Sequence, residues 1–306
     1  MLRIATSMIY QQSSRAISDR QVALAKVQQQ MATGNRILTA SDDPVGSARL
    51  LSLNEELDRY DQYQRNIDLA NGRLNVEETA LKDAGEIFQR ARELTIQAGN
   101  DTLNDSDRKN IAKEIRQLQE QLVSLANTQD GNGEYVFSGF KSDTQPFTLD
   151  KTTQVVTYAG DQGQRLIQAG PSLDIPVGDS GQAVFQMDPS DASKGMFATL
   201  HDLATALETK SGQELHDAMT AGLVKVDQGL EQLTNVRAQV GARLNTLDAQ
   251  ESANGDFTVH LQQTMSDIGD LDYADAATRL SQETLILQAA QQSFLRIQDL
   301  SLFNYL

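Results

Sequence analysis

Apolar residues recur every seven positions between Asp43 and Gln97, and this period constrains the fold more than any other feature of the chain. The repeated positions are Leu53, Tyr60, Ile67, Leu74, Leu81 and Phe88. Seven residues is the period of a coiled coil rather than of an ordinary surface helix. Asp43 suits an N-cap, and Pro44 suits the first helical position because no N–H is needed there. The stretch predicts a rod-like helix of about 55 residues that ends at Gly99-Asn100.

Both ends of the chain carry a similar apolar seam. The first 38 residues repeat at seven-residue steps through Tyr10, Ile17, Leu24, Met31 and Leu38, and the last segment has Tyr273, Ala276, Leu280, Leu287, Ala290, Phe294 and Ile297 three or four apart or at multiples of that spacing. Residues 1–36 hold five basic side chains and one acidic one, whereas residues 270–306 hold five acidic and two basic ones. Matching seams and opposite charges predict that the ends pair as helices. Two unrelated amphipathic tails are the alternative.

The two arms have few apolar residues for their length. Ordering the backbone costs conformational entropy at every residue, and one seam residue in seven offsets only part of it. We therefore expect the arms to be largely disordered in the monomer and to order when neighbouring copies bury their second faces. The expected assembly interface is Tyr10, Ile17, Leu24, Met31, Leu38, Leu280, Leu287, Phe294, Ile297 and Leu306. The alternative for each position is an ordinary core residue of a monomeric bundle.

The middle of the chain differs in composition. Nine of the twenty glycines and four of the five prolines lie between Gly131 and Gly195. Short β-prone runs predict strands at 135–137, 155–158, 165–167 and 183–185, and residues 160–163 predict a hairpin loop. Helical spacing predicts helices at 104–125, 197–207 and 213–252, the last broken by Asn254-Gly255-Asp256.

These patterns predict a mainly α fold: an elongated, coiled-coil-like helical bundle with a small β-rich inserted domain and helical or disordered terminal arms. The predicted parts are an N-terminal arm (1–43), the first part of the rod domain (44–130), a β-rich outer domain (131–195), the second part of the rod domain (196–255) and a C-terminal arm (256–306). Both arms are expected to be disordered until assembly.

Composition argues against several classes of function. The net charge of −16 disfavours nucleic acid and anionic membrane surfaces as partners. The sequence has no run of 18 apolar residues and no apolar core of a secretory signal near Met1, which indicates cytosol or export without a cleaved signal. Cysteine is absent, so disulfides, thiolate metal sites and cysteine nucleophiles are excluded.

Catalytic patterns are also missing from the sequence. His201, His216 and His260 lie at least fifteen residues apart, which does not suit a metal site. The adjacent acid pairs Glu55-Glu56 and Glu77-Glu78 point apart on a helix and indicate solvated faces. There is no Gly-x-Ser-x-Gly elbow, no Gly-x-Gly-x-x-Gly and no phosphate loop. We expect no enzyme, no metal and no cofactor.

Three internal stretches resemble one known family. Thr33-Gly34-Asn35-Arg36-Ile37-Leu38-Thr39-Ala40-Ser41-Asp42-Asp43-Pro44-Val45-Gly46 is similar to the connector of flagellin-type proteins, and Gly133-Glu134-Tyr135-Val136-Phe137-Ser138-Gly139 and Gln239-Val240-Gly241-Ala242-Arg243-Leu244-Asn245 resemble two further signatures of that family. The ends Ile4–Gln12 and Ser301–Leu306 are more similar to its hook–filament junction branch than to filament flagellin. The resemblance covers nearly the whole chain, and residues 131–195 are its least distinctive part.

The resemblance implies a structural protein of the bacterial flagellum. Such a protein would be exported unfolded by the flagellar type III route and would assemble outside the cell as a ring between the first junction protein and flagellin. The arms would pair in the inner tube, the long helices would form a rod domain of the flagellin type, and the β-rich insert would face outward. An export chaperone would cover the C-terminal arm before secretion, since Leu280, Leu287, Phe294 and Ile297 would otherwise be exposed.

Other functions remain open at this point. Filament flagellin, which polymerises with itself, is the nearest alternative. A soluble coiled-coil module, such as an adhesin or a secreted effector, is another class. An enzyme would have to reside in residues 131–195, where no residue pattern supports one.

Overall fold

A computed structural model describes residues 2–100, 103–186 and 194–299, and side-chain surroundings are described for residue 8 and for residues 10–296 within these ranges. The chain divides into two compact units. The arm unit comprises residues 1–59 and 256–306, and the core unit comprises residues 60–255.

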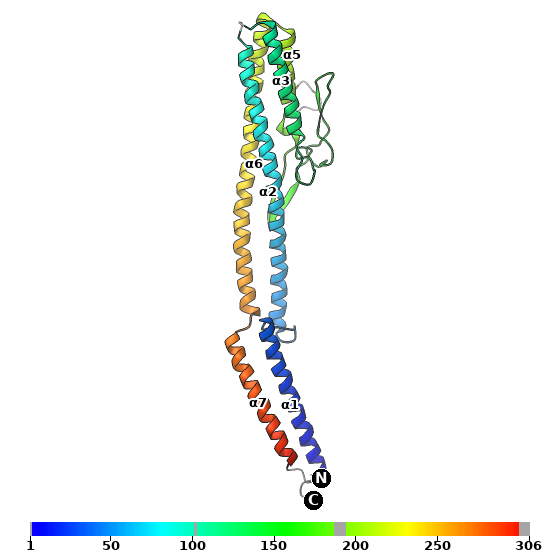
Figure 1. Ribbon diagram of the computed structural model, residues 1–306, viewed down its shortest axis with the longest axis vertical. Coiled ribbons are helices and arrows are strands. Elements are labelled where there is room, and N and C mark those ends of the chain that lie inside the picture. Colours follow the sequence, from blue (N-terminus) through cyan, green and yellow to red (C-terminus); the bar gives the residue numbers. More distant parts are fainter. Residues whose placement is uncertain (1, 101–102, 187–193, 300–306) are drawn as a thin grey trace. The chain divides into compact units, whose positions relative to one another are not determined.

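The described residues form seven helices and four strands (Figure 1). Their bounds are α1 Leu2–Thr33, α2 Pro44–Ala98, α3 Asp105–Ala126, β1 Phe147–Leu149, β2 Val156–Tyr158, β3 Leu166–Gly170, β4 Leu173–Pro176, α4 Gly181–Val184, α5 Met196–Thr209, α6 Gly212–Gly269 and α7 Tyr273–Asp299. The predicted mainly helical fold with a small β-rich insertion is confirmed.

Local chemistry sets the helix ends where the sequence predicts them. The Asp43 carboxylate accepts a hydrogen bond from the Gly46 amide at 2.8 Å, which caps α2 directly before Pro44. Gly34, which follows α1, has φ +74°, a conformation that side chains other than glycine rarely adopt. Asn104 caps α3 through the Asp107 amide. The predicted starts of α2 and α3 and the stop after α1 are confirmed.

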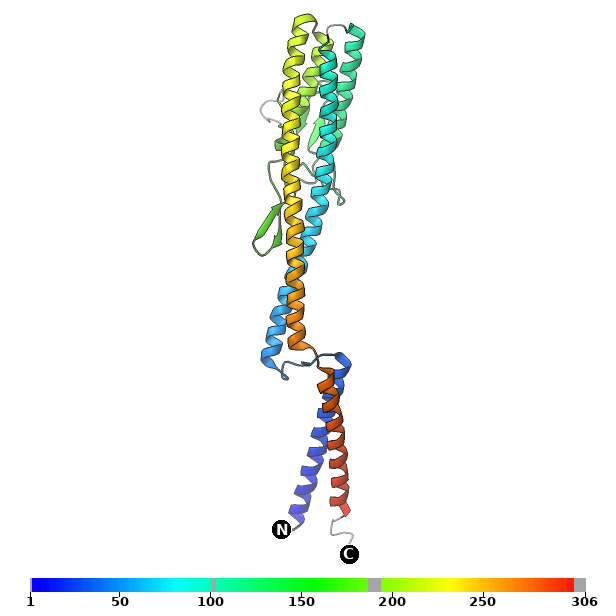
Figure 2. The same cartoon turned by 90° about the vertical axis from the view of Figure 1, so that its left-hand side faces the viewer.

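In the core unit, helices α2, α3, α5 and α6 pack around one apolar core (Figures 1 and 2). The predicted seven-residue seam is its centre, and the side chains at Ile67, Leu74, Leu81 and Phe88 are 0 % exposed. Gly229 of α6 lies against the Phe88 ring, because a Cβ there would be 2.6 Å from it. Complete burial at successive steps of seven explains why α2 stays helical through the core unit.

The β-rich insert holds two separate two-stranded antiparallel sheets, one of β1 with β2 and one of β3 with β4. The strands predicted at 155–158 and 165–167 are confirmed, although β2 and β3 each begin one residue later than predicted. The strand prediction at 183–185 is wrong, because Ser180 caps the short helix α4 and the Phe185 ring packs on Phe137 at 5.5 Å. Residues 135–137 form only an isolated bridge at Tyr135, so the strand predicted there is also wrong.

Residues 160–163 do not close a hairpin, although their glycines predict one. They connect β2 to β3, which belong to different sheets. The Asp161 carboxylate accepts hydrogen bonds from the amides of Phe140 (2.9 Å) and Gly163 (2.8 Å), and this holds the segment as a connection across the insert.

The break predicted at Asn254-Gly255-Asp256 is wrong, since α6 continues to Gly269. The Asn254 side chain is buried, donates to the Ala169 carbonyl at 3.0 Å and accepts from Gln250 at 2.7 Å. Its side-chain amide is therefore occupied by hydrogen bonds to the insert and to Gln250. It does not compete for the backbone hydrogen bonds of α6.

Buried charges fasten the insert to the long helices of the core unit. Arg73 of α2 bonds Asp130 and Glu134, each at 3.0 Å. Arg243 of α6 bonds both carboxylate oxygens of Asp179 at 2.9 and 3.0 Å. The Asp179 amide in turn donates to Glu77 of α2. These links come from both long helices and reach the start of the insert at Asp130 and Glu134 and its later part at Asp179.

Glu77 is the most deeply buried acid of this group, so the solvated face predicted for it from the Glu77-Glu78 pair is wrong. Burial, followed by the charge of Asp179, raises the pKa of Glu77 to about 8, although the positive charges of Arg243 and Arg73 act in the opposite direction. Its Oε2 atom has no hydrogen-bond partner. The fold therefore holds this carboxyl group as the neutral acid at pH 7.

Candidate assembly surface

The terminal helices α1 and α7 lie side by side in both views (Figures 1 and 2). The rings of Tyr10 and Phe294 pack with their centroids 4.8 Å apart. Further along, the Arg20 guanidinium lies 3.4 Å from the Glu283 carboxylate. The predicted pairing of the two ends as helices is confirmed, and the described residues include one pair of opposite charges across it.

The predicted interface residues are only partly covered by this pairing. Tyr10 is 41 % exposed. The half-buried members are Ile17, Leu24, Met31, Leu38, Leu280, Leu287 and Phe294. Ile297 lies within α7, but its side chain is not described, and Leu306 lies outside the described residues. Pairing of the two helices alone therefore leaves each described residue of the expected interface partly in contact with water.

The best-buried apolar residues of the two arms were not included in the expected assembly interface. Val27, Leu271 and Ala276 are buried, and they lie where α1 ends and α7 begins. Ala276 is a member of the predicted C-terminal seam, and Val27 lies three residues after Leu24 of the N-terminal seam, but neither was included in the expected interface. Leu271 lies between α6 and α7, so no helical period marks it.

Other apolar side chains of the arms are exposed. Met8 is 66 % exposed on α1, and Leu285 is 67 % exposed on α7. Val22 on α1 and Ile286 and Leu295 on α7 are exposed as well. Apolar residues on faces that the partner helix does not cover are typical of a surface that another molecule buries.

Two aspartates organise the connector between α1 and α2. Asp42 bonds Lys26 at 2.6 Å and accepts from the amides of Leu38 and Thr39, both at 3.1 Å. The bond to Lys26 is the main reason why the pKa of Asp42 is lowered to about 2. The Gly46 amide, followed by Arg36, likewise lowers the pKa of Asp43. Both carboxylates are therefore ionised at neutral pH, as caps and salt bridges require.

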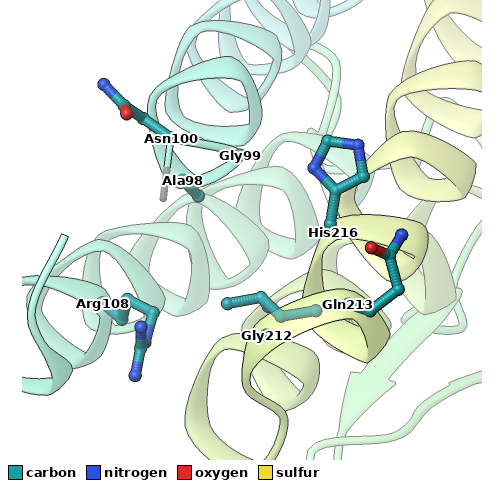
Figure 3. Close-up of a pocket in the computed structure, with 8 residues that line it drawn as sticks. Ala98, Gly99, Asn100, Arg108, Gly212, Gln213 and His216 are labelled. Carbon is teal, nitrogen blue, oxygen red and sulfur yellow. The ribbon is translucent and has the colours of Figure 1, made fainter. Parts of the chain in front are cut away.

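One open pocket of about 380 Å³ lies where α2 ends and α6 begins. Figure 3 shows the side chains of Arg108, Gln213 and His216 around it, pointing in different directions. Among the described residues, no three His, Cys, Asp or Glu side chains are grouped as metal ligands. No described helix has both the length and the hydropathy of a membrane span.

Comparison with known proteins places both ends of the chain in one family. Residues 4–142 match the bacterial flagellin N-terminal helical region, and residues 223–306 match the bacterial flagellin C-terminal helical region.

Individual relatives and structures agree with this. The chain is 33 % identical to flagellar hook-associated protein 3 of Escherichia coli K12, over 99 % of both chains. It is 26 % identical to flagellin of Bacillus subtilis, over 90 % of this chain and 89 % of the flagellin. The crystal structure of the flagellar junction protein FlgL of Legionella pneumophila superposes with a TM-score of 0.60 at 24 % identity, over 72 % of this chain and all of that one. At that identity the superposition supports the fold alone.

Proposed function

The chain belongs to the bacterial flagellin family, and from this premise we propose that it is a structural subunit of the hook–filament junction of the flagellum. Its similarity to hook-associated protein 3 extends over nearly the full length of both chains. The match to a flagellin is weaker and covers less of either chain. A junction subunit is therefore better supported than filament flagellin.

One structural observation carries the mechanism: the paired arms leave apolar seams incompletely buried. Leu24 and Leu287 are half-buried, whereas Val22 and Leu285 are exposed on the same helices. A second copy that covers these faces would bury apolar surface, and this burial favours association. The arms then act by coupled folding and association, in which each subunit is ordered by its neighbours.

The partners follow from this role. Copies of the chain would form a ring layer, with the first junction protein on one side and flagellin on the other. An export chaperone would cover the C-terminal arm before assembly, because its exposed apolar residues would otherwise associate prematurely. The protein would leave the cell by the flagellar type III route and act outside it, without catalysis. The predicted arms, 1–43 and 256–306, would be largely disordered toward their free ends until assembly.

Charged substitutions in the seam test the proposal. We expect Leu24→Asp and Leu287→Asp to block incorporation into the flagellum, because a carboxylate cannot be buried unpaired in an apolar seam. Ser18→Asp, at an exposed position of α1, is the matched control. Electron microscopy of flagella from a complemented deletion strain measures incorporation, and unfolding by denaturant checks that the core unit is intact. A normal filament base with Leu24→Asp would contradict the mechanism.

The alternative functions predict other outcomes. Filament flagellin would grow long filaments from seeds without other proteins, whereas a junction subunit would add one bounded layer. A secreted coiled-coil module would leave flagella unaffected when its gene is deleted. A junction subunit predicts that the deletion strain has hooks that shed monomeric flagellin.

A further inference from the structure

Four helix ends meet at the connector, residues 34–43. Here α1 ends at Thr33, α2 begins at Pro44, α6 ends at Gly269 and α7 begins at Tyr273, all within the arm unit. Helix ends leave backbone amides and carbonyls without partners inside the helix. Four such ends in one place need many hydrogen bonds, and one side chain supplies several of them.

That residue is Arg36. Its Nε and Nη2 atoms donate to the Ile268 carbonyl at 3.1 and 2.7 Å, and its own amide donates to the Gly269 carbonyl at 2.7 Å. Both carbonyls belong to the last turn of α6, which carries the negative end of the helix dipole. A guanidinium group at this place satisfies them and complements their charge.

Arg36 also contacts the start of α2 and the end of α1. Its Nη2 atom lies 3.2 Å from the Asp43 carboxylate that caps α2. Its carbonyl accepts from Gln30, a buried side chain of α1, at 2.6 Å. Arg36 therefore contacts the end of α1, the cap of α2 and the end of α6 at once.

Further hydrogen bonds hold the beginning of α7 against the end of α1. The Leu271 amide donates to the Gly34 carbonyl at 2.9 Å, and Asn35 and Asp270 form an isolated antiparallel bridge. The Tyr273 hydroxyl donates to the Met31 carbonyl at 3.3 Å. The two arms are thus joined in a fixed register at their connector end.

Apolar side chains of the arms are more buried near the connector than near the free ends. Val27, Leu271 and Ala276 are buried close to the connector, whereas Tyr10 near the free end is 41 % exposed. The first pairing contacts of two helices cost the most entropy, and later ones add to an existing nucleus. The connector already holds the end of α1 against the start of α7. It therefore lowers the entropy cost of the first pairing contacts at that end of the arms only.

We propose that Arg36 is a positioning residue for assembly: it locks the connector joint so that α1 and α7 begin to pair there and order outward to their free ends. This inference deepens the proposed function, and rests on it, because the outward order leaves the free ends for neighbouring subunits. It concerns the free protein, however, and is measured without assembly.

Amide hydrogen exchange on the purified full chain tests the proposal. In the wild type we expect protection at residues 27–33 and 271–280 that declines toward residue 10 and residue 296. Arg36→Gln should accelerate exchange in both segments about tenfold or more, because it removes the charge-assisted hydrogen bonds of the guanidinium to the Ile268 carbonyl and to Asp43. The core unit should keep its exchange rates and its unfolding midpoint.

Two further variants separate positioning from general damage. Arg36→Lys should restore part of the protection, because an ammonium reaches the Ile268 carbonyl but lacks the fork that also reaches Asp43. Arg49→Gln removes an exposed arginine of α2 in the same unit and should change nothing. Exchange in Arg36→Gln within about twofold of the wild type would overturn the proposal, and so would wild-type arms that are unprotected near the connector or equally protected throughout. Failure of the junction role would appear separately, as Leu24→Asp protein that still incorporates.

Discussion

The arm unit and the core unit share a seven-residue apolar period but differ in what covers it. Along α2 in the core unit, Ile67, Leu74, Leu81 and Phe88 are completely buried, whereas Tyr10 in the arm unit is 41 % exposed. The core seam is covered by helices and an insert, and the arm seam only by one other helix. A period thus specifies which face is apolar, and the number of neighbouring elements decides how much free energy that face contributes.

Charges differ between the units in the same way. The core unit buries charged groups between helices and insert, with Arg243 and Asp179 largely shielded from water. The pair across the arms, Arg20 with Glu283, is more exposed and has a longer contact of 3.4 Å. Breaking a buried pair is costly because the remaining charge stays uncompensated, whereas an exposed pair contributes little. This contrast supports the proposal that the core unit is stable alone and that other molecules complete the arm unit.

The largest expected effect is on the apolar seams. Phe88→Ala should lower the free energy of unfolding by about 3–5 kcal/mol, because the ring is fully buried against α6. Leu24→Ala in the half-buried arm seam should lower it by less than about 1 kcal/mol. Urea unfolding of each purified variant measures both values. Equal losses would show that the arms are as firmly packed as the core.

A second prediction concerns the buried acid Glu77. Its pKa is raised to about 8 in the folded protein, above the unfolded value near 4.5. Between these values the unfolded chain has released a proton that the folded chain retains, so stability falls as pH rises through this window. Glu77→Gln should remove that loss and raise stability at pH 9 on the order of 2 kcal/mol, with little change at pH 4.

The measurement is urea unfolding at pH 4, 7 and 9. Glu86→Gln, on the same helix but exposed, is the control and should keep the pH dependence of the wild type. A wild-type stability that is flat from pH 5 to 9 would show that Glu77 is ionised in the fold.

Alanine substitutions at two glycines compare the connector with the part of α2 in the core unit. Gly34 has φ +74° and lies under the Tyr273 hydroxyl, so Gly34→Ala should destabilise the connector by about 1 kcal/mol. Gly85 is inside α2 with open space at its Cβ position, so Gly85→Ala should stabilise the core unit by about 0.5–1 kcal/mol. Amide exchange near residue 34 and urea unfolding measure the two effects. Opposite signs are expected, and a stabilising Gly34→Ala would contradict the strained turn.

The sequence predicts the helices better than it predicts the insert, for a physical reason. Helix starts such as Asp43-Pro44 depend on local chemistry, and the core seam depends on a period that is visible in the chain. In the insert, 183–185 has β-prone residues, but packing of Phe185 and the cap at Ser180 decide for a helix. Asn254 is a breaker in sequence and a buried bonding partner of Ala169 in the fold. Such tertiary contacts have no signature in the local sequence.

The candidate surface shows the same limit. The seven-residue spacing identifies which residues of the arms share a seam, and the ring contact of Tyr10 with Phe294 agrees with it. It does not identify Arg36, whose role depends on carbonyls more than two hundred residues away in α6. A basic residue after a helix-ending glycine is compatible with many contacts, so only the fold reveals this one.

The smallest expected effect is that of the charged pair across the arms. Arg20→Gln and Glu283→Gln should each change the stability of the free protein by less than about 0.5 kcal/mol, because the pair is partly exposed and screened by salt. A double-mutant cycle in urea unfolding measures the coupling between the two side chains. Swapping the charges, with Arg20→Glu together with Glu283→Arg, should keep that coupling if the two groups meet only each other. In assembled flagella the pair would be desolvated by neighbouring subunits, so the single variants should reduce incorporation more than they reduce stability. Coupling above about 1 kcal/mol in the free protein would show that the arms are already fully docked before assembly, and the contrast between the two units would then disappear.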